Sequence, residues 1–235
     1  MSESLPGIPA LPSNPATAVL FEPALVATRL SELQPSLDEV LLREANEHGY
    51  RARLEATKLH APTAAGTYHW NATLFALRFA LTERDWVAEN LRNCPFIVSP
   101  DRKVAIAVMT GDPETGLVAG NPTNQARKGA VLERAVAQNQ QLELFDPAAV
   151  SKDLANSQDA TQLWVLLYHV AVGADGKPEI RAELSLPSRF ARKQIVGWTE
   201  RIVLAAIRPD GEPVIGQDEP TGPIDVPVER RTGTS

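Results

Sequence analysis

Residues 162–187 hold the feature that most constrains the fold, a pair of apolar runs separated by a tight-turn signal. The runs QLWVLLYHVAV and PEIRAELSLP flank Asp175 and Gly176. An Asp-Gly pair supplies the positive backbone φ angles of a two-residue turn whose twist matches that of antiparallel strands. The sequence therefore predicts a β-hairpin, and with it a sheet that is antiparallel at least in this region.

The chain before this hairpin has helical spacing. Residues 36–56 start with a capping box formed by Ser36 and Glu39, and their apolar residues recur on one side, which predicts a helix that Gly49 breaks or kinks. Residues 67–81 also repeat at helical spacing, and two further phenylalanines indicate a helix buried on most sides. Alternation in this segment also permits a strand.

A second capping box, Thr82 with Asp85, predicts a helix over residues 83–93. From Pro95 onward the apolar period changes to two, which is typical of strands. The remaining predicted elements are strands at 96–100 and 103–110, a helix at 123–140, a short strand at 142–145, a polar connection at 146–160 and a strand at 197–207.

Helices first and strands later predict an α+β protein, with N-terminal helices packed on a mainly antiparallel β-sheet and one inserted helix. A doubly wound parallel fold is disfavoured because strands and helices do not alternate regularly. We expect a single domain over residues 18–207. The Pro-rich tail 1–17 and the acidic, Pro-rich tail 208–235 are expected to be disordered, because each can bury little apolar surface.

Composition narrows the function classes. A net charge of -6 argues against a surface built throughout to hold nucleic acid, although a local basic patch is compatible with it. The single cysteine, Cys94, cannot form an intrachain disulfide, and we expect a buried structural thiol in a reducing cytoplasm. The longest apolar runs are far shorter than the roughly 20 residues that span a bilayer. We therefore expect a soluble, cytoplasmic protein without a membrane partner.

The predicted hairpin carries a charged row with two interpretations. Glu179, Arg181, Glu183 and Ser185 alternate with aliphatic residues, as the solvated face of a strand requires. Alternatively, Glu179 and Glu183 with Asp159 are the acids of a metal-dependent nuclease. Arg181 stands where such a site needs a lysine and is a poor replacement for it. The solvated face is the favoured interpretation.

Common catalytic motifs are absent from the sequence. It contains no nucleophile elbow, phosphate-binding loop or dinucleotide fingerprint, and its four histidines and one cysteine have no zinc-site spacing. We therefore predict no cofactor and no metal ligand, and the sequence leaves open whether the protein is an enzyme. His69 near the start of the helix at 67–81 is interpreted as a packing residue with a polar tip.

Positive charge is nevertheless clustered near the last strand. If the segments that carry it meet in space, the cations could hold phosphate oxygens while an aromatic ring stacks on a base. The alternative is a loop whose charges are solvated and whose aromatic residues lie in the core. The residues of this predicted anion or nucleic-acid site are Arg127, Lys128, Arg189, Arg192, Lys193, Trp198 and Arg201.

The favoured function is an accessory or binding protein of bacterial type that contacts nucleic acid or a protein partner through this basic patch. The first alternative is a metal-dependent nuclease or another phosphodiester-acting enzyme. The second is a structural subunit of a larger assembly, in which the apolar helix 67–81 stays partly exposed until it meets a partner.

Overall fold

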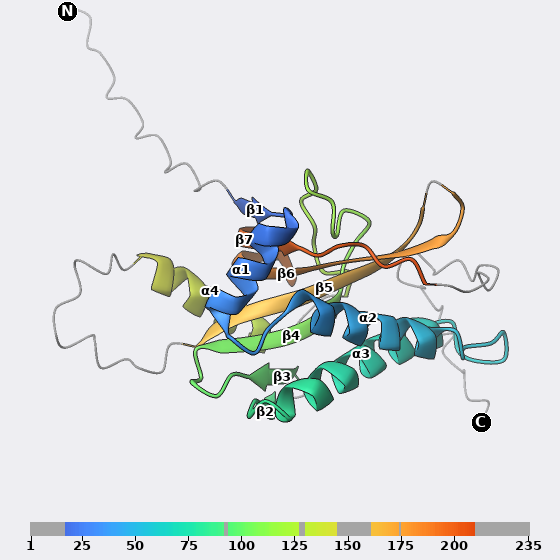
Figure 1. Ribbon diagram of the computed structural model, residues 1–235, viewed down its shortest axis with the longest axis horizontal. Helices are drawn as coiled ribbons and strands as arrows, with labels where there is room; N and C mark the ends of the chain where they lie inside the picture. The colour runs from blue at the N-terminus through green and yellow to red at the C-terminus, as the bar shows by residue number, and fades with distance from the viewer. Residues whose placement is uncertain (1–16, 92–93, 127–129, 145–160, 174, 210–235) are drawn as a thin grey trace, which may run out of the picture.

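A computed structural model describes residues 17–91, 94–126, 130–144, 161–173 and 175–209 (Figure 1). These residues form four helices and one seven-stranded mixed sheet, so the predicted α+β class is confirmed. The helices are α1 (Pro23–Leu33), α2 (Glu39–Arg53), α3 (Ala64–Thr82) and α4 (Ala130–Leu144). The strands are β1 (Ala18–Leu20), β2 (Val87–Leu91), β3 (Cys94–Val98), β4 (Val104–Thr110), β5 (Gln162–Val172), β6 (Pro178–Ala191) and β7 (Gln194–Val203).

The strand order is β1-β7-β6-β5-β4-β3-β2. Four of the neighbouring pairs are antiparallel, and the pairs β1–β7 and β4–β5 are parallel. The predicted hairpin is present as β5–β6, and Gly176 in its turn has a φ of 77°. The parallel β4–β5 pair requires a crossover connection, and α4 lies within that connection.

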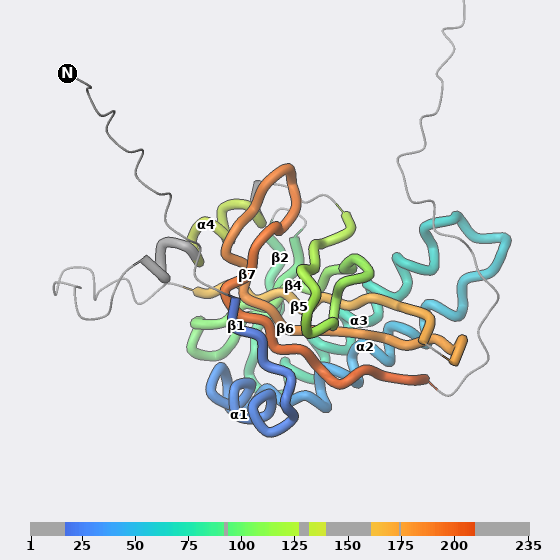
Figure 2. The backbone as a smooth tube through the Cα atoms, turned by 90° about the horizontal axis from the view of Figure 1, so that it is seen from above, coloured from blue at the N-terminus to red at the C-terminus, as the bar shows by residue number. Residues whose placement is uncertain are grey.

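The sheet is covered on both faces. On one face, Leu30, Leu42 and Leu77 from α1, α2 and α3 share a core with Ile106 and Leu184 of the sheet. On the other face, α4 contributes Leu132 and Val136 to a second core with sheet residues that include Met109, Val165 and Trp198. Figure 2 shows α1 and α4 on opposite sides of β7. No helix in the described part of the chain combines the length and hydrophobicity needed to cross a membrane.

The predicted helix over 83–93 is wrong, because this segment contains the edge strand β2. Thr82 does not cap a new helix; its hydroxyl donates back to the carbonyls of Arg78 and Phe79 within α3. Asp85 then takes a left-handed φ of 64°, which turns the chain out of the helix and into the strand. Strand pairing with β3 therefore outweighs the helix-capping preference of this segment.

Two other local predictions are wrong. The segment predicted as a strand at 142–145 continues helix α4 to Leu144. The cap of α2 is Asp38, whose carboxylate accepts from the backbone N–H of Leu41, whereas the Ser36 hydroxyl accepts from the indole N–H of Trp86.

Gly49 neither breaks nor kinks α2, which continues to Arg53. A Cβ atom at Gly49 would lie 2.0 Å from the Thr73 Oγ1 atom and 2.6 Å from the His69 ring. Gly49 therefore allows α2 to pack closely against α3. The predicted tails fall almost entirely on residues 1–16 and 210–235, and the polar connection on 146–160; these lie outside the described residues.

Candidate functional site

The buried ion pair between Glu183 and Arg201 is the main polar feature of the sheet. The two residues are 0% and 2% exposed. Glu183 accepts hydrogen bonds from the Arg201 Nε atom at 3.0 Å, from the Ser185 hydroxyl at 2.8 Å and from the backbone N–H of Gly116 at 2.9 Å. The predicted solvent exposure of Glu183 and Ser185 is therefore wrong.

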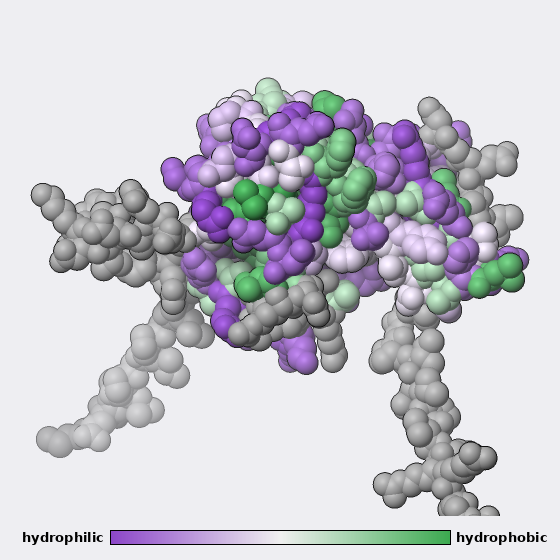
Figure 3. All heavy atoms as spheres, turned by 90° about the horizontal axis from the view of Figure 1, so that it is seen from below, coloured by the Kyte–Doolittle hydropathy of each residue, from purple (hydrophilic) through white to green (hydrophobic). Residues whose placement is uncertain are grey.

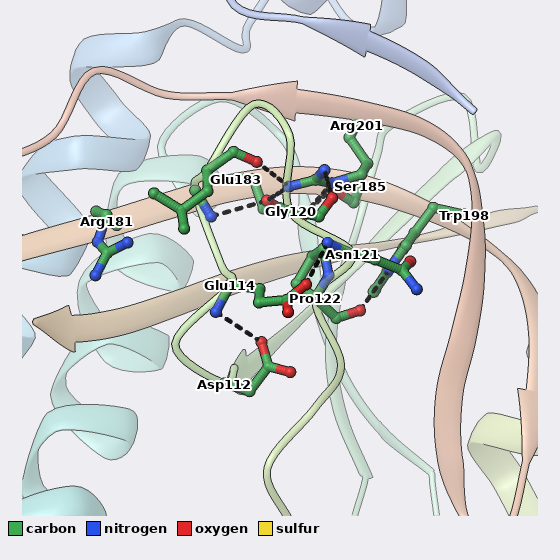
Figure 4. Close-up of polar contacts among 12 residues, drawn as sticks. Asp112, Glu114, Gly120, Asn121, Pro122, Arg181, Glu183, Ser185, Trp198 and Arg201 are labelled. Carbon is green, nitrogen blue, oxygen red and sulfur yellow. Dashed lines mark hydrogen bonds and ion pairs between the residues drawn. The ribbon is translucent and has the colours of Figure 1, made fainter. Parts of the chain in front are cut away.

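This burial is caused by the segment 111–126, which follows β4 and precedes α4 in the sequence. The segment lies over this face of the sheet (Figure 4). Arg201 donates to the carbonyls of Leu117 at 3.0 Å and of Gly120. The Trp198 indole N–H donates to the carbonyl of Pro122 at 2.8 Å. Side chains of β6 and β7 thus hold this loop against the sheet by hydrogen bonds to its backbone.

Arg201 and Trp198 are consequently engaged inside the protein, and Trp198 is 3% exposed. A buried guanidinium paired with a carboxylate cannot also neutralise a phosphate, and a buried indole cannot stack on a base. The sequence contains one signal for this arrangement. Residues 111–122 lack strand or helix periodicity, and a loop of this length in a compact domain is uncommon and is usually either functional or disordered.

The acids of the nuclease interpretation do not converge among the described residues. Glu179 pairs with Arg181 at 3.6 Å and with Arg208 at 3.5 Å. It lies four residues from Glu183 along β6, a spacing of about 13 Å in an extended strand. Asp159 lies outside the described residues. Within the described chain, no three His, Cys, Asp or Glu residues are grouped so as to hold a metal ion.

Asp112 is a partly buried acid that sequence reasoning missed. Burial raises its pKa above the ordinary value, and the hydrogen bond that it accepts from the backbone N–H of Glu114 opposes this shift. The His169 Nδ1 atom lies 3.1 Å from the carbonyl oxygen of Gly111, and Arg181 donates to the carbonyl of Pro113 at 3.3 Å. These contacts hold the first residues of loop 111–126 against the sheet, and Asp112 adds one carboxylate there.

His69 of α3 is completely buried, with its ring against α2 and β5. Its ring stacks on that of Tyr168 with centroids 4.1 Å apart, and burial lowers its pKa to about 3. Neither ring nitrogen has a hydrogen-bond partner among the described residues. A neutral imidazole in this environment has no access to a substrate, and His69 therefore acts as a packing residue.

The β6–β7 hairpin presents the remaining predicted cations. Ala191 pairs with Gln194, so that Arg192 and Lys193 form a two-residue turn. Their φ angles are 52° and 66°, the sign that a type I′ turn requires at both central positions. Both are exposed, as is Arg189, whose guanidinium donates to the carbonyl of Val196 at 3.2 Å.

These three cations, Arg189, Arg192 and Lys193, form the basic hairpin tip. Within the described chain none of them has an acidic partner. Arg102 also has a left-handed φ, of 59°, but it pairs with Glu89 at 3.0 Å. The sequence-predicted cations Arg127 and Lys128 lie outside the described residues.

The chain matches no protein family, and no curated protein or solved structure resembles it significantly. Function must therefore be argued from the site alone.

Proposed function

We propose that this protein is a non-enzymatic accessory or binding protein whose basic hairpin tip contacts the phosphates of nucleic acid. One observation carries the proposal: Arg192 and Lys193 occupy both left-handed positions of a two-residue turn and have no acidic partner in the described chain. A left-handed conformation costs a residue with a side chain about 1–2 kcal/mol, and Asn-Gly is the pair that such turns favour. Strain of this kind is common where function requires particular side chains.

The chemistry of the tip fits a phosphate backbone. The guanidinium groups of Arg189 and Arg192 present paired donors that match phosphate oxygens, and the Lys193 ammonium adds a mobile point charge. On a chain with a net charge of -6, this tip supplies the local positive potential that nucleic acid requires. Because Trp198 is buried, the contact we propose is with the backbone rather than with bases.

The test compares two double variants of the full chain for binding to a fluorescently labelled DNA duplex. R192N/K193G removes both tip charges and keeps a favourable turn. K58N/K177N removes two exposed cations that likewise have no acidic partner in the described chain, and is the matched control. We expect R192N/K193G to weaken binding at least about tenfold at about 50 mM salt, with little change in the control. Equal effects of the two variants, or no binding by the wild type, would refute the proposal.

The nuclease alternative has less support, because the described residues contain no group of three or more His, Cys, Asp or Glu side chains that could hold a metal ion. The structural-subunit alternative has one observation in its favour, the exposed aromatic residues Phe75 and Phe79 of α3.

A further inference from the structure

Helix α3 exposes two phenylalanines. Phe75 and Phe79 are 60% and 59% exposed, and their rings stack with centroids 6.1 Å apart. The prediction that this helix is buried on most sides is therefore wrong for its outward row. Figure 3 views the molecule from the side on which α3 lies and shows hydrophobic side chains at the surface among polar ones. Exposed, adjacent aromatic rings are typical of contact surfaces.

The same helix lacks free charge. Arg78 is the one charged residue among the 19 residues of α3. Its guanidinium donates to the carbonyls of Glu89 and Phe96 and to the side chain of Asn90, at 2.6–3.0 Å. The Arg78 guanidinium therefore binds β2 and β3. It is not a free charge beside the exposed rings of Phe75 and Phe79.

Helix α2 borders this row with a second exposed row. Val40, Glu44 and His48 recur every four residues and are exposed, and the His48 ring centroid lies 6.4 Å from that of Phe75. The helices are antiparallel, as the pairs His48–Phe75 and Asp38–Arg84 show. One helical turn back along α2 therefore corresponds to one turn forward along α3, which places Glu44 beside Phe79.

We propose that these five residues form a docking surface for a second copy of this chain. We name it the α2–α3 face: Val40, Glu44, His48, Phe75 and Phe79. A two-fold axis perpendicular to α3 sets Phe75 of one copy against Phe79 of the other, and His48 against Glu44 of the other. The aromatic pairs then bury each other, and the His48 imidazole N–H donates to the opposing carboxylate.

The second copy is the partner that this pattern fits. The donor His48 and the acceptor Glu44 are one helical turn apart on α2, and Phe75 and Phe79 are one turn apart on α3. A two-fold rotation therefore sets each residue against a suitable partner, and the face is complementary to itself. From 1.5 Å per residue, α2 and α3 are about 22 and 28 Å long, and two adjacent helices cover a face of roughly 500 Å². Two such faces bury about 1,000 Å², the lower limit for a specific interface, so a reversible dimer is expected.

Sedimentation velocity of the full chain from about 1 to 100 µM tests the proposal. We expect the mass to rise with concentration from 25.5 kDa toward twice that value. F75S/F79S should raise the dimer dissociation constant at least about tenfold, as expected for central aromatic contacts. The control L117S/V118S removes two other exposed hydrophobic residues, on the loop that covers the opposite face, and should leave it unchanged.

An exchange of charges identifies the geometry. H48E brings two carboxylates together across the axis and should weaken the dimer, and the double variant E44H/H48E should restore it. A monomer at every concentration would overturn the proposal. So would a dimer that tolerates F75S/F79S, one that L117S/V118S dissociates equally, or one that E44H/H48E fails to restore. None of these outcomes depends on nucleic-acid binding.

Discussion

At the scale of single residues, the pairing of Glu183 with Arg201 determines how one face of the sheet is used. Both side chains are buried, and the carboxylate also holds Ser185 and the Gly116 backbone. The cost of removing two charges from water is offset only while every partner is in place. The pair therefore stabilises loop 111–126 as part of the folded domain rather than as a mobile lid.

Glu183→Gln should accordingly lower the free energy of unfolding by about 3–5 kcal/mol, because it leaves Arg201 buried without its counter-charge. Glu179→Gln is the matched control, since its carboxylate pairs at longer distances nearer the surface, and should cost no more than about 1 kcal/mol. Urea denaturation of the two variants measures the difference. Similar small losses for both would show that the buried pair does not hold the loop.

His69 makes stability depend on pH. Its pKa is about 3 in the folded protein and about 6.5 when unfolded. The unfolded chain therefore binds the proton more readily below pH 6.5, and this contribution to stability is full above that pH and is lost as the pH falls. Between pH 6.5 and 5 the loss is about 1–2 kcal/mol.

The variant His69→Phe keeps a ring against Tyr168 and removes the titration. We expect the unfolding free energy of the wild type to fall more steeply than that of H69F between pH 7 and 5. The measurement is chemical denaturation at several pH values in that range. Parallel curves for the two proteins would mean that His69 does not remain neutral in the core.

At the scale of elements, the β6–β7 turn is the place where local preference and observed sequence disagree. Arg192 and Lys193 occupy conformations that favour Asn and Gly. R192N/K193G should therefore raise the free energy of unfolding by about 1–2 kcal/mol. Thermal unfolding measures this change; a destabilised variant would show that the tip side chains serve the fold rather than binding.

Strong local patterns predicted the elements that depend on them. The Asp175-Gly176 hairpin, the helix at 67–81 and the paired strands of β3 and β4 follow from turn chemistry and periodicity. Residues 83–93 have a capping motif, but tertiary pairing with β3 makes Val87–Leu91 a strand. Residues 142–145 are a short, mostly apolar run that was predicted as a strand, but helix α4 continues through it to Leu144.

The site was harder to predict because its exposure depends on a distant segment. Glu183 alternates with aliphatic residues as a solvated residue does, and Arg201 belongs to a cluster of cations. The burial of both depends on loop 111–126, more than 60 residues earlier. Strand alternation gives the face on which a side chain lies, not what covers that face. The two-residue turn at Arg192 and Lys193 was not predicted either, because its φ angles are those that Asn and Gly favour.

At the scale of the whole molecule, the basic hairpin tip and the exposed hydrophobic residues of the α2–α3 face lie on different parts of the protein. The basic hairpin tip lies at the turn between β6 and β7, and the α2–α3 face lies on the helices that cover the other face of the sheet. Dimerisation through the α2–α3 face leaves the tip of each copy free. A dimer would then carry two tips and bind a long duplex more tightly than a monomer does.

The dependence of duplex affinity on salt concentration is the sharpest test of the proposed contact between the basic hairpin tip and phosphates. Each phosphate contact contributes about 0.9 to the slope of log affinity against log salt concentration, so loss of two tip contacts should make the slope of R192N/K193G shallower by about 1.8 than that of the wild type. Equal slopes for the two proteins would contradict the claim that Arg192 and Lys193 contact phosphates.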